Sequence, residues 1–401
     1  MTKGSSTSSQ ENLDDYAKIS RLCSLCSRMC RHSCPTHLVT RSDACSPVGR
    51  ALIIELYRGG KSALTETAVD RLYQCNLCGA CKAWCMPRHE LPRIIELCRE
   101  RVVAEHRAPT GTLELDKNTS DFFNVYGEPH NERFENLQNV LKKSSSTAEI
   151  AYFVGCTTAY RHPEIASAAH IVLARLGLDI TFLDGERDEV CCGSPLIRAG
   201  FTESARSLAE QNVKAIKESG AKTIITTCPG CARALKLDYP QLGVYLPKKV
   251  KVLHITELLV KHRKQLAQQI KSPLLTKQAG TPITITYHDP CHLGRELGIY
   301  DPPRQLLKLI PGVDLMEFHH NREYADCCGG GGALPKTFPD LAKEITRTRL
   351  AQIPTTTNSY LVSACPNCKF HFTETQNLAK ETDLKILDLM ELLAQVLKER
   401  R

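Results

Sequence analysis

The spacing of apolar positions divides the chain into two parts with different predicted structure. From residue 150 onward, short apolar runs typical of buried strands occur at 150–154, 180–183, 223–227, 250–253, 283–287 and 360–363. Between these runs, apolar residues recur with a helical period at 164–176, 202–218, 302–309 and 339–352. A last helix, expected to pack on a domain or on a partner, is predicted at 385–397. This alternation of strands and helices predicts an α/β architecture.

The first part of the chain has a helical pattern, with helices predicted at 48–57, 64–72 and 94–104. Residues 107–149 are polar, contain Pro and Gly and end in a Ser-rich stretch, so they are predicted to form a connector. The first fifteen residues are polar, lack the apolar core of a secretory signal, and are expected to be flexible or to lie on a partner. No stretch approaches the roughly 20 apolar residues of a membrane span.

The second part contains the same five cysteines twice. The first copy consists of Cys156, Cys191, Cys192, Cys228 and Cys231, and the second of Cys291, Cys327, Cys328, Cys365 and Cys368. Matching positions lie 135 to 137 residues apart, which indicates a duplicated module. The first and fourth cysteines of each copy follow predicted strands, where open α/β sheets bind their ligands.

Five thiols in one module favour an iron–sulfur cluster. They exceed the four ligands of a tetrahedral zinc site, and cysteine thiolates are the usual ligands of iron–sulfur clusters. The chain has 20 cysteines in 401 residues, more than packing requires, and disulfides are disfavoured in a reducing cytosol. A zinc-bound scaffold with ten structural thiols is the alternative.

Two further cysteine runs lie in the helical first part. One consists of Cys23, Cys26, Cys30 and Cys34, and the other of Cys75, Cys78, Cys81 and Cys85. The second run nearly matches the bacterial ferredoxin spacing, whereas the first has one extra residue between its second and third cysteines. A pair of zinc ribbons is the alternative, although ribbons usually show two separated C-x-x-C pairs. Cys45 and Cys98 fit neither run and are predicted to be a loop residue and a packing residue.

The tandem five-cysteine pattern resembles the cysteine-rich CCG domains of heterodisulfide reductase. The likeness extends to the segments 152–156, 288–292 and 327–332, and related domains occur in iron–sulfur subunits of glycolate oxidase, lactate-utilisation and anaerobic glycerol-3-phosphate dehydrogenase systems. The resemblance implies an α+β chain overall, with an N-terminal helical dicluster ferredoxin domain and two duplicated α/β CCG domains. The predicted division is a flexible N-terminus at 1–20, the ferredoxin-like domain at 21–106, the connector at 107–149, and CCG domains at 150–278 and 279–401.

The resemblance also implies the cofactors. By the family pattern, one cubane [4Fe-4S] cluster takes Cys23, Cys26, Cys30 and Cys85, and the other takes Cys75, Cys78, Cys81 and Cys34. Because both five-cysteine sets are complete, it further implies two noncubane [4Fe-4S] clusters, one in each CCG domain. The extra residue in the first run leaves the geometry of the first cubane site open.

Residues around these cysteines are candidates for chemistry. His292 and Arg295 follow Cys291 and are predicted to act catalytically as a proton donor or an anion clamp, with ordinary loop hydrogen bonding as the alternative. The glycines 329–332 lack the Lys-Ser/Thr that follows a phosphate loop. We expect them to bring backbone close to a cluster and to donate N–H groups to sulfur.

The predicted function is that of an iron–sulfur subunit in a multi-subunit oxidoreductase. Electrons would pass from the cubane to the noncubane clusters, where disulfide or thiol chemistry takes place. The alternative is a non-catalytic electron-transfer subunit that serves a flavoprotein acting on an organic acid or thioester. The expected partner is a flavoprotein or another iron–sulfur subunit, and the expected location is cytoplasmic, with membrane attachment only through a partner. The net charge of +8 is spread along the chain and does not predict nucleic-acid binding.

Overall fold

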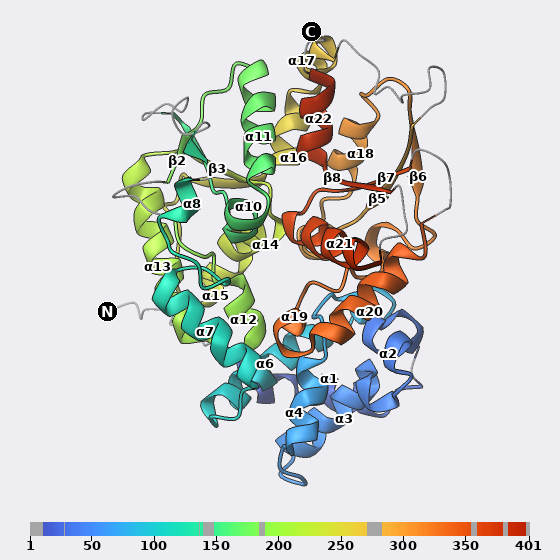
Figure 1. The fold of residues 1–401 in the computed structure, drawn as a ribbon. Helices are drawn as coiled ribbons and strands as arrows, with labels where there is room; N and C mark the ends of the chain where they lie inside the picture. The colour runs from blue at the N-terminus through green and yellow to red at the C-terminus, as the bar shows by residue number, and fades with distance from the viewer. Residues whose placement is uncertain are drawn as a thin grey trace, which may run out of the picture.

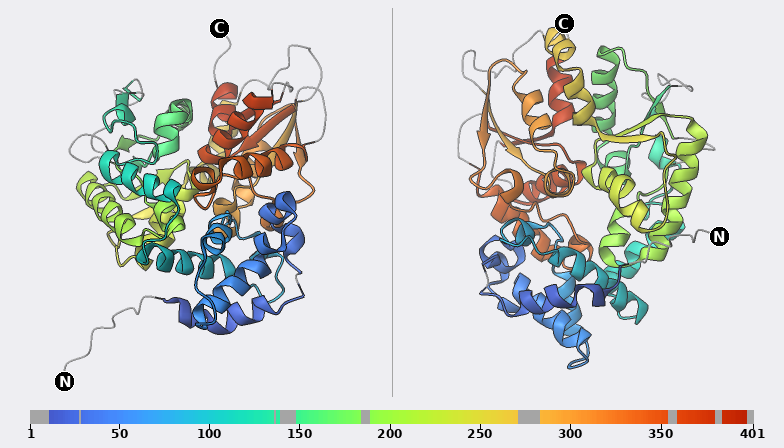
Figure 2. Two further views of the ribbon diagram at one scale, coloured as in Figure 1. Left: turned by 60° about the horizontal axis from the view of Figure 1, so that its bottom comes forward. Right: turned by 180° about the vertical axis from the view of Figure 1, so that it is seen from behind.

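The computed structural model describes residues 11–27, 29–135, 137–138, 148–183, 189–270, 283–353, 359–379 and 384–397. Three parts of the chain are visible in Figure 1: a helical N-terminal part at the bottom, and two sheet-containing domains side by side above it. The view from behind shows the same arrangement (Figure 2).

The N-terminal part is built from helices. They are η1 (Leu13–Tyr16), α1 (Ala17–Ser24), η2 (Arg31–Ser33), α2 (Pro35–Thr40), η3 (Asp43–Cys45), α3 (Pro47–Arg58), α4 (Glu66–Tyr73), α5 (Ala80–Ala83) and α6 (Leu91–Ala104). The hydroxyl groups of Ser46 and Thr65 accept backbone N–H groups at the starts of α3 and α4. Leu13 is buried in the core of this part, so the flexible segment predicted at 1–20 is too long. Residues 1–10 lie outside the described part.

The described part of the predicted connector is helical and packed. It contains α7 (Thr110–Phe122) and α8 (Glu132–Glu135). Leu115 joins the core of the sheet domains, and Arg133 is fully buried. This segment therefore covers the first sheet domain. Its polar sequence gave no indication of this packing, because the buried groups are few and one of them is charged.

Each sheet domain has four parallel strands in the same order. The first sheet runs β2-β1-β3-β4 and the second β6-β5-β7-β8. The strands are β1 (Ile150–Tyr152), β2 (Thr181–Phe182), β3 (Thr223–Thr226), β4 (Lys251–His254), β5 (Ile283–His288), β6 (Val313–Glu317), β7 (Ser359–Ser363) and β8 (Lys385–Asp388). The shared topology confirms the duplicated α/β architecture.

The predicted helix at 385–397 is wrong in its first four residues. These residues form the edge strand β8, and the helix α22 (Leu389–Leu397) begins only after Asp388. The Asp388 carboxylate accepts the Met390 N–H at 2.8 Å and so provides the helix start. The edge strand β6 was not predicted.

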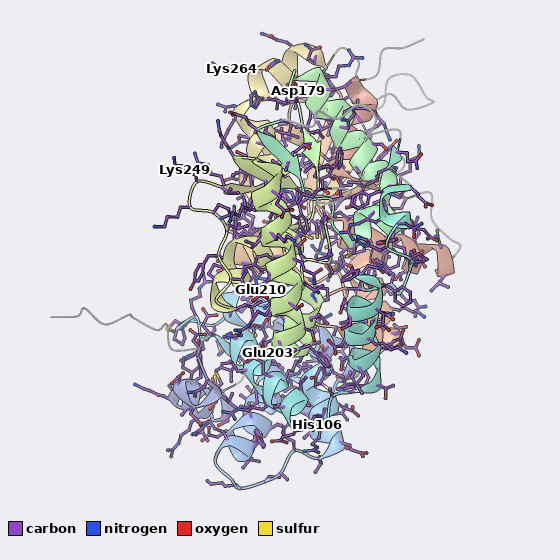
Figure 3. The ribbon with its side chains drawn as sticks, turned by 90° about the vertical axis from the view of Figure 1, so that its left-hand side faces the viewer. His106, Asp179, Glu203, Glu210, Lys249 and Lys264 are labelled. Atoms are coloured by element: carbon purple, nitrogen blue, oxygen red, sulfur yellow. The ribbon has the colours of Figure 1, made fainter. Side chains whose placement is uncertain are left out.

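Helices cover the sheets and join the domains. The first domain has α10 (Cys156–Arg161), α11 (Pro163–Arg175), α12 (Ser194–Ala199), α13 (Thr202–Ser219), α14 (Pro229–Arg233), the π-helical η5 (Ala234–Asp238), α15 (Tyr239–Gln241), α16 (Ile255–Lys261) and α17 (Arg263–Gln269). The second has the π-helical η6 (His292–Glu296), α18 (Asp301–Leu307), η7 (Arg322–Tyr324), α19 (Leu334–Thr337), α20 (Pro339–Leu350) and α21 (Pro366–Ala379). On the outer side of the first domain, α13 presents Glu203 and Glu210 to solvent (Figure 3).

The two sheet domains meet like the two halves of a symmetric dimer. Helix α11 packs on α22, and their counterparts α18 and α16 pack on each other. Likewise α10 contacts α21, and η6 contacts α14. Such reciprocal contacts define a pseudo-two-fold axis between the copies. Within the described residues, we find no helix with the length and apolar character needed to cross a membrane.

Candidate metal centres and the cavity between the sheet domains

The N-terminal part brings its eight cysteines together in two groups of four. The first group consists of Cys23, Cys26, Cys30 and Cys85, the set that the family pattern assigns to one cubane. Burial, together with the neighbouring cysteines of the group, raises the pKa of Cys23 to about 11 and that of Cys30 to about 12. Thiols in this surrounding stay protonated unless a cation binds them, so the group suits a positively charged metal centre.

The second group consists of Cys34, Cys75, Cys78 and Cys81, which line one small cavity with Arg50. Arg50 donates to the Cys34 sulfur at 3.6 Å, and the Leu77 N–H donates to the Cys75 sulfur at 3.4 Å. Burial raises the pKa of Cys81 well above its ordinary value, and Cys30 of the first group adds to this effect. The two groups therefore adjoin.

Each sheet domain gathers its five cysteines at the carboxyl ends of the strands. In the first domain, contacts between thiols link Cys156 to Cys191, Cys191 to Cys192, Cys192 to Cys231 and Cys231 to Cys228. In the second domain, the equivalent contacts link Cys291 to Cys327, Cys327 to Cys328, Cys328 to Cys368 and Cys368 to Cys365. The same connected set of five thiols thus occurs twice.

The glycines 329–332 have a second role, in domain docking, that the sequence did not predict. Gly329 donates its N–H to the Cys327 sulfur at 3.4 Å, as expected of backbone near a cluster. A Cβ on Gly331 or Gly332 would overlap the carbonyl oxygen of Asn76 or Cys75, which come from the N-terminal part. The Asn76 amide also donates to the Gly329 carbonyl at 2.9 Å. The glycines therefore allow close docking between the N-terminal part and the second domain.

A cavity of about 420 Å³ lies between the sheet domains at their pseudo-two-fold axis. Nine cysteines line it: Cys156, Cys191, Cys192, Cys228, Cys231, Cys291, Cys328, Cys365 and Cys368. Cys228 and Cys365, which are equivalent residues of the two copies, are in contact with each other. The two cysteine sets therefore open into one shared space.

The N-terminal part reaches the second cysteine set directly. Hydrogen bonding with Cys327 lowers the pKa of Cys78 to about 6, although burial opposes this shift. Arg295 donates to the Cys78 carbonyl at 2.6 Å. Among the described residues, the four cysteine groups thus form one connected series from the N-terminal part to the cavity.

The two predicted catalytic residues occupy different places. His292 lines the cavity, and a Cβ placed on Gly230 would lie 3.6 Å from its Nδ1. Burial holds the pKa of His292 well below its ordinary value, and the cations Arg233 and Arg198 lower it further. Arg295 lies away from the cavity lining, because its guanidinium also donates to the carbonyls of Glu323 (3.1 Å) and Ala325 (2.6 Å) at the junction with the N-terminal part.

Several buried polar residues near the cysteines were not predicted from the cysteine motifs. Arg133 donates to the Cys156 sulfur at 3.7 Å and forms a fully buried ion pair with Glu189. Glu189 in turn accepts the N–H groups of Val154 and Gly155 at 2.6 and 2.7 Å and so shapes the turn before Cys156. The position of Glu189, two residues before a cysteine pair, is the one signal that the sequence offered.

The remaining two cysteines lie outside the four groups. Cys98 is fully buried within α6, where burial raises its pKa to about 12, in agreement with a packing role. Cys45 ends η3, is fully buried rather than exposed on a loop, and donates its thiol to the Gln74 side chain at 3.2 Å. The other 18 cysteines are grouped as four, four, five and five, mostly buried or half-buried apart from the exposed Cys26, and some of their sulfurs accept backbone N–H groups. This arrangement suits iron–sulfur ligation.

Comparison with known proteins agrees with this arrangement. Residues 150–236 and 285–373 match the family model described as the CCG cysteine-rich domain. Over 342 residues the chain is 36% identical to a subunit of the dihydromethanophenazine:CoB–CoM heterodisulfide reductase of Methanosarcina acetivorans, covering 83% of this chain and 79% of that protein. The chain belongs to the family of this heterodisulfide reductase subunit. The predicted family is therefore confirmed.

Other relatives share the same region but are longer. One subunit of the fumarate reductase (CoM/CoB) of Methanothermobacter marburgensis is 30% identical over 81% of this chain and 61% of that protein. The probable iron–sulfur-binding oxidoreductase FadF of Bacillus subtilis is 30% identical over 81% of this chain and 46% of that protein. With these relatives, the chain is an iron–sulfur, electron-transferring oxidoreductase subunit.

Proposed function

We propose that this chain is the subunit of a heterodisulfide reductase-like complex that both conducts electrons and reduces a disulfide. The N-terminal groups would hold two cubane [4Fe-4S] clusters, and each five-cysteine set would hold one noncubane [4Fe-4S] cluster. When bound, the clusters would supply single electrons to a disulfide in the shared cavity. The observation that carries this proposal is the cavity itself, because nine of the ten cysteines of the two five-cysteine sets line it.

The contacts between the groups give the proposed order. Cys30 adjoins Cys81 within the N-terminal part, Cys78 contacts Cys327, and Cys365 contacts Cys228 across the axis. In this series the N-terminal part contacts the second sheet domain, and the second domain contacts the first. The order of the two domains in the series is therefore the reverse of their order in the sequence. A series of adjoining groups supports stepwise delivery of two electrons.

The cavity lining suits a small anionic disulfide. A volume of about 420 Å³ lies within the usual range of about 300–1,000 Å³ for small-molecule sites. Its lining includes the apolar side chains of Leu115 and Phe370 and the cations Arg161 and Lys336, and among the residues that the structure describes it has no carboxylate. Reduction of a disulfide to two thiols consumes two electrons and two protons. His292 and His371 line the cavity and are the groups proposed to pass those protons.

An exposed apolar surface marks the proposed entry of electrons. Leu22, Leu25, Met29 and Met86 are 49%, 75%, 70% and 96% exposed, and each is next in sequence to a first-group cysteine. Residues 16–42 carry five Lys or Arg residues and no carboxylate. An apolar patch in a basic rim is complementary to an electron carrier with an acidic rim, which we propose as the partner.

Reduction by an acidic bacterial ferredoxin tests this entry site. Leu25→Asp and Met86→Asp are expected to slow cluster reduction by the ferredoxin about tenfold or more, while leaving reduction by dithionite unchanged. Leu378→Asp, which changes a 59% exposed leucine on α21, is the matched control. Equal rates in all variants, or tight binding of the wild-type chain to anionic vesicles with no ferredoxin effect, would exclude this partner.

Metal content after purification without oxygen tests the number of clusters. Four clusters predict about 16 irons, as much acid-labile sulfide, and little zinc per chain. Cys231→Ser is expected to lower the iron content by about one cluster, whereas Cys98→Ala should leave it unchanged. About 8 irons with zinc in the sheet domains would contradict the proposal and favour the scaffold alternative.

The similarity to longer redox proteins supports a second candidate function, that of an electron relay. The EtfAB:quinone oxidoreductase of Syntrophomonas wolfei is 28% identical over 81% of this chain and 46% of that protein. A relay subunit that serves a flavoprotein would need no substrate in the cavity. Turnover of a heterodisulfide with reduced viologen by the isolated four-cluster chain, lost in His292→Phe, favours disulfide reduction. Full cluster content with no turnover favours the relay.

A further inference from the structure

The residues that surround the two five-cysteine sets differ between the two copies. His288 lies three residues before Cys291, and the equivalent residue before Cys156 is Phe153. The adjacent helices can be aligned through Gly193 and Gly329, whose backbones pack against Ala205 and Ala342 respectively. Seven residues after these alanines stand Asn212 in the first domain and Arg349 in the second. The first copy thus has a neutral pair where the second has an imidazole and a guanidinium.

His288 is part of the second cysteine set in space. One of its ring nitrogens lies within 4.8 Å of the sulfur atoms of both Cys328 and Cys368, and all three residues are buried. Its Nδ1 accepts from the Arg349 Nε at 3.5 Å, a long hydrogen bond. The edges of Phe318 and Phe372 face the ring, with centroids 6.5 and 5.0 Å away. With Nδ1 as the acceptor, a neutral His288 carries its proton on Nε2, which leaves an N–H for sulfur.

Arg349 brings positive charge that is only partly compensated. It is 1% exposed, lies 3.5 Å above the Phe318 ring, and donates to the Gln352 side chain at 2.6 Å and to the His320 carbonyl at 3.3 Å. Its ion pair with the Asp326 carboxylate is long, at 3.7 Å. Arg295, on the other side of the same cysteine set, donates to carbonyl groups.

The first cysteine set has a neutral surrounding in comparison. Asn212 uses its amide to bond the Cys191 carbonyl at 3.0 Å and the Val190 N–H at 3.1 Å. Arg133 is the cation beside Cys156, and its charge is balanced by the ion pair with Glu189. Less uncompensated positive charge therefore faces the first set than the second.

We propose that His288 and Arg349 make the second five-cysteine site the more easily reduced of the two, so that it retains an electron. Positive charge and N–H donors near cluster sulfurs favour the reduced state because reduction adds negative charge. The second site is also the one that contacts the N-terminal part through Cys78 and Cys327. The inference rests on the proposed function, since both sites must hold a cluster.

A redox titration of the full, cluster-loaded chain followed by electron paramagnetic resonance tests this inference. The two sheet-domain signals should appear at different midpoint potentials, and Cys328→Ser identifies the second site because it alters that signal alone. Arg349→Asn and His288→Phe install the residues of the first copy. Each is expected to shift the second-site midpoint to more negative potential, towards that of the first site.

Two controls keep the test decisive. Arg347→Asn changes an exposed residue of α20 two positions from Arg349 and should leave both midpoints unchanged. His288→Gln retains an N–H donor and should preserve most of the separation if His288→Phe does not fold. Fewer than four clusters by iron content would refute the proposed function. Four clusters with coincident midpoints in the wild type, or with midpoints that neither substitution moves, would overturn the inference alone.

Discussion

Replacing Arg99 by methionine is expected to loosen the N-terminal part from both sheet domains. The buried guanidinium donates to two carbonyls of its own part, those of Leu72 (2.6 Å) and Cys75 (2.7 Å). It also donates to the Arg198 carbonyl (2.6 Å) of the first domain and the Gly332 carbonyl (2.9 Å) of the second. One side chain therefore joins three parts of the chain.

The magnitude follows from these four hydrogen bonds. Each bond to a charged donor stabilises a fold by about 1.5–3 kcal/mol. Burial opposes this gain because the guanidinium loses its hydration, an effect that also lowers the pKa of Arg99. The bonds therefore do not add, and Arg99→Met is expected to cost about 3–5 kcal/mol, as when one partner of a buried charge network is lost. At about 2–4 °C per kcal/mol, the Tm should fall by about 10 °C.

Thermal unfolding of the cluster-loaded protein measures this loss. Trp84 is the one tryptophan of the chain, and it packs against Tyr324 and His320 of the second domain, with centroids 4.5 and 5.7 Å apart. Its emission should therefore change when the parts separate. Arg101→Met is the control, because Arg101 is exposed two residues along the same helix. A Tm for Arg99→Met within about 2 °C of this control would refute the reasoning.

Three other substitutions have defined outcomes. Gly332→Ala should lower the Tm and the iron content, because its Cβ would overlap the Cys75 carbonyl oxygen, whereas Gly60→Ala, at a similar φ but in open space, should cost only about 1 kcal/mol. Burial raises the pKa of Asp388 from 3.8 to about 8, so ionisation destabilises the fold increasingly between these pH values. Asp388→Asn should therefore stabilise the protein by at least about 1 kcal/mol at pH 8 and much less at pH 4, as measured by denaturant unfolding. Tyr73→Phe removes a buried hydrogen bond to the Ala199 carbonyl (2.8 Å) and should cost about 1 kcal/mol, visible as a lower denaturation midpoint.

The cysteine groups could be predicted from the sequence because their spacing is tied to the strands. Cys228 and Cys365 follow β3 and β7 by two residues, and the parallel strands bring both to the same kind of sheet edge. The duplicated order of strands and helices repeated this geometry at a near-constant interval. The chemistry of cysteine, the fixed spacing and the regular alternation of strands and helices thus all indicated the same ligand positions.

The elements that sequence patterns missed lie at edges and between domains. In β6 no residue is fully buried, and the exposed Asp314 and Glu317 interrupt the apolar run. In β8 the apolar residues continue directly into the pattern of α22, and only the capping role of Asp388 separates the two elements. Arg99 and Asn76 act as single polar side chains, which leave no periodic signal in the sequence.

The N-terminal part breaks the symmetry that duplication created. The pseudo-two-fold axis places the equivalent Cys228 and Cys365 face to face, and a cavity built only from the two copies would treat both cysteine sets alike. The N-terminal part contacts both domains, through Tyr73 on the first and Asn76 on the second. Yet the thiol contact that the described residues show is between Cys78 and the second set. In the proposed series one copy receives the electron first, so substitutions such as those at positions 288 and 349 give the two sites different roles without altering the shared cavity.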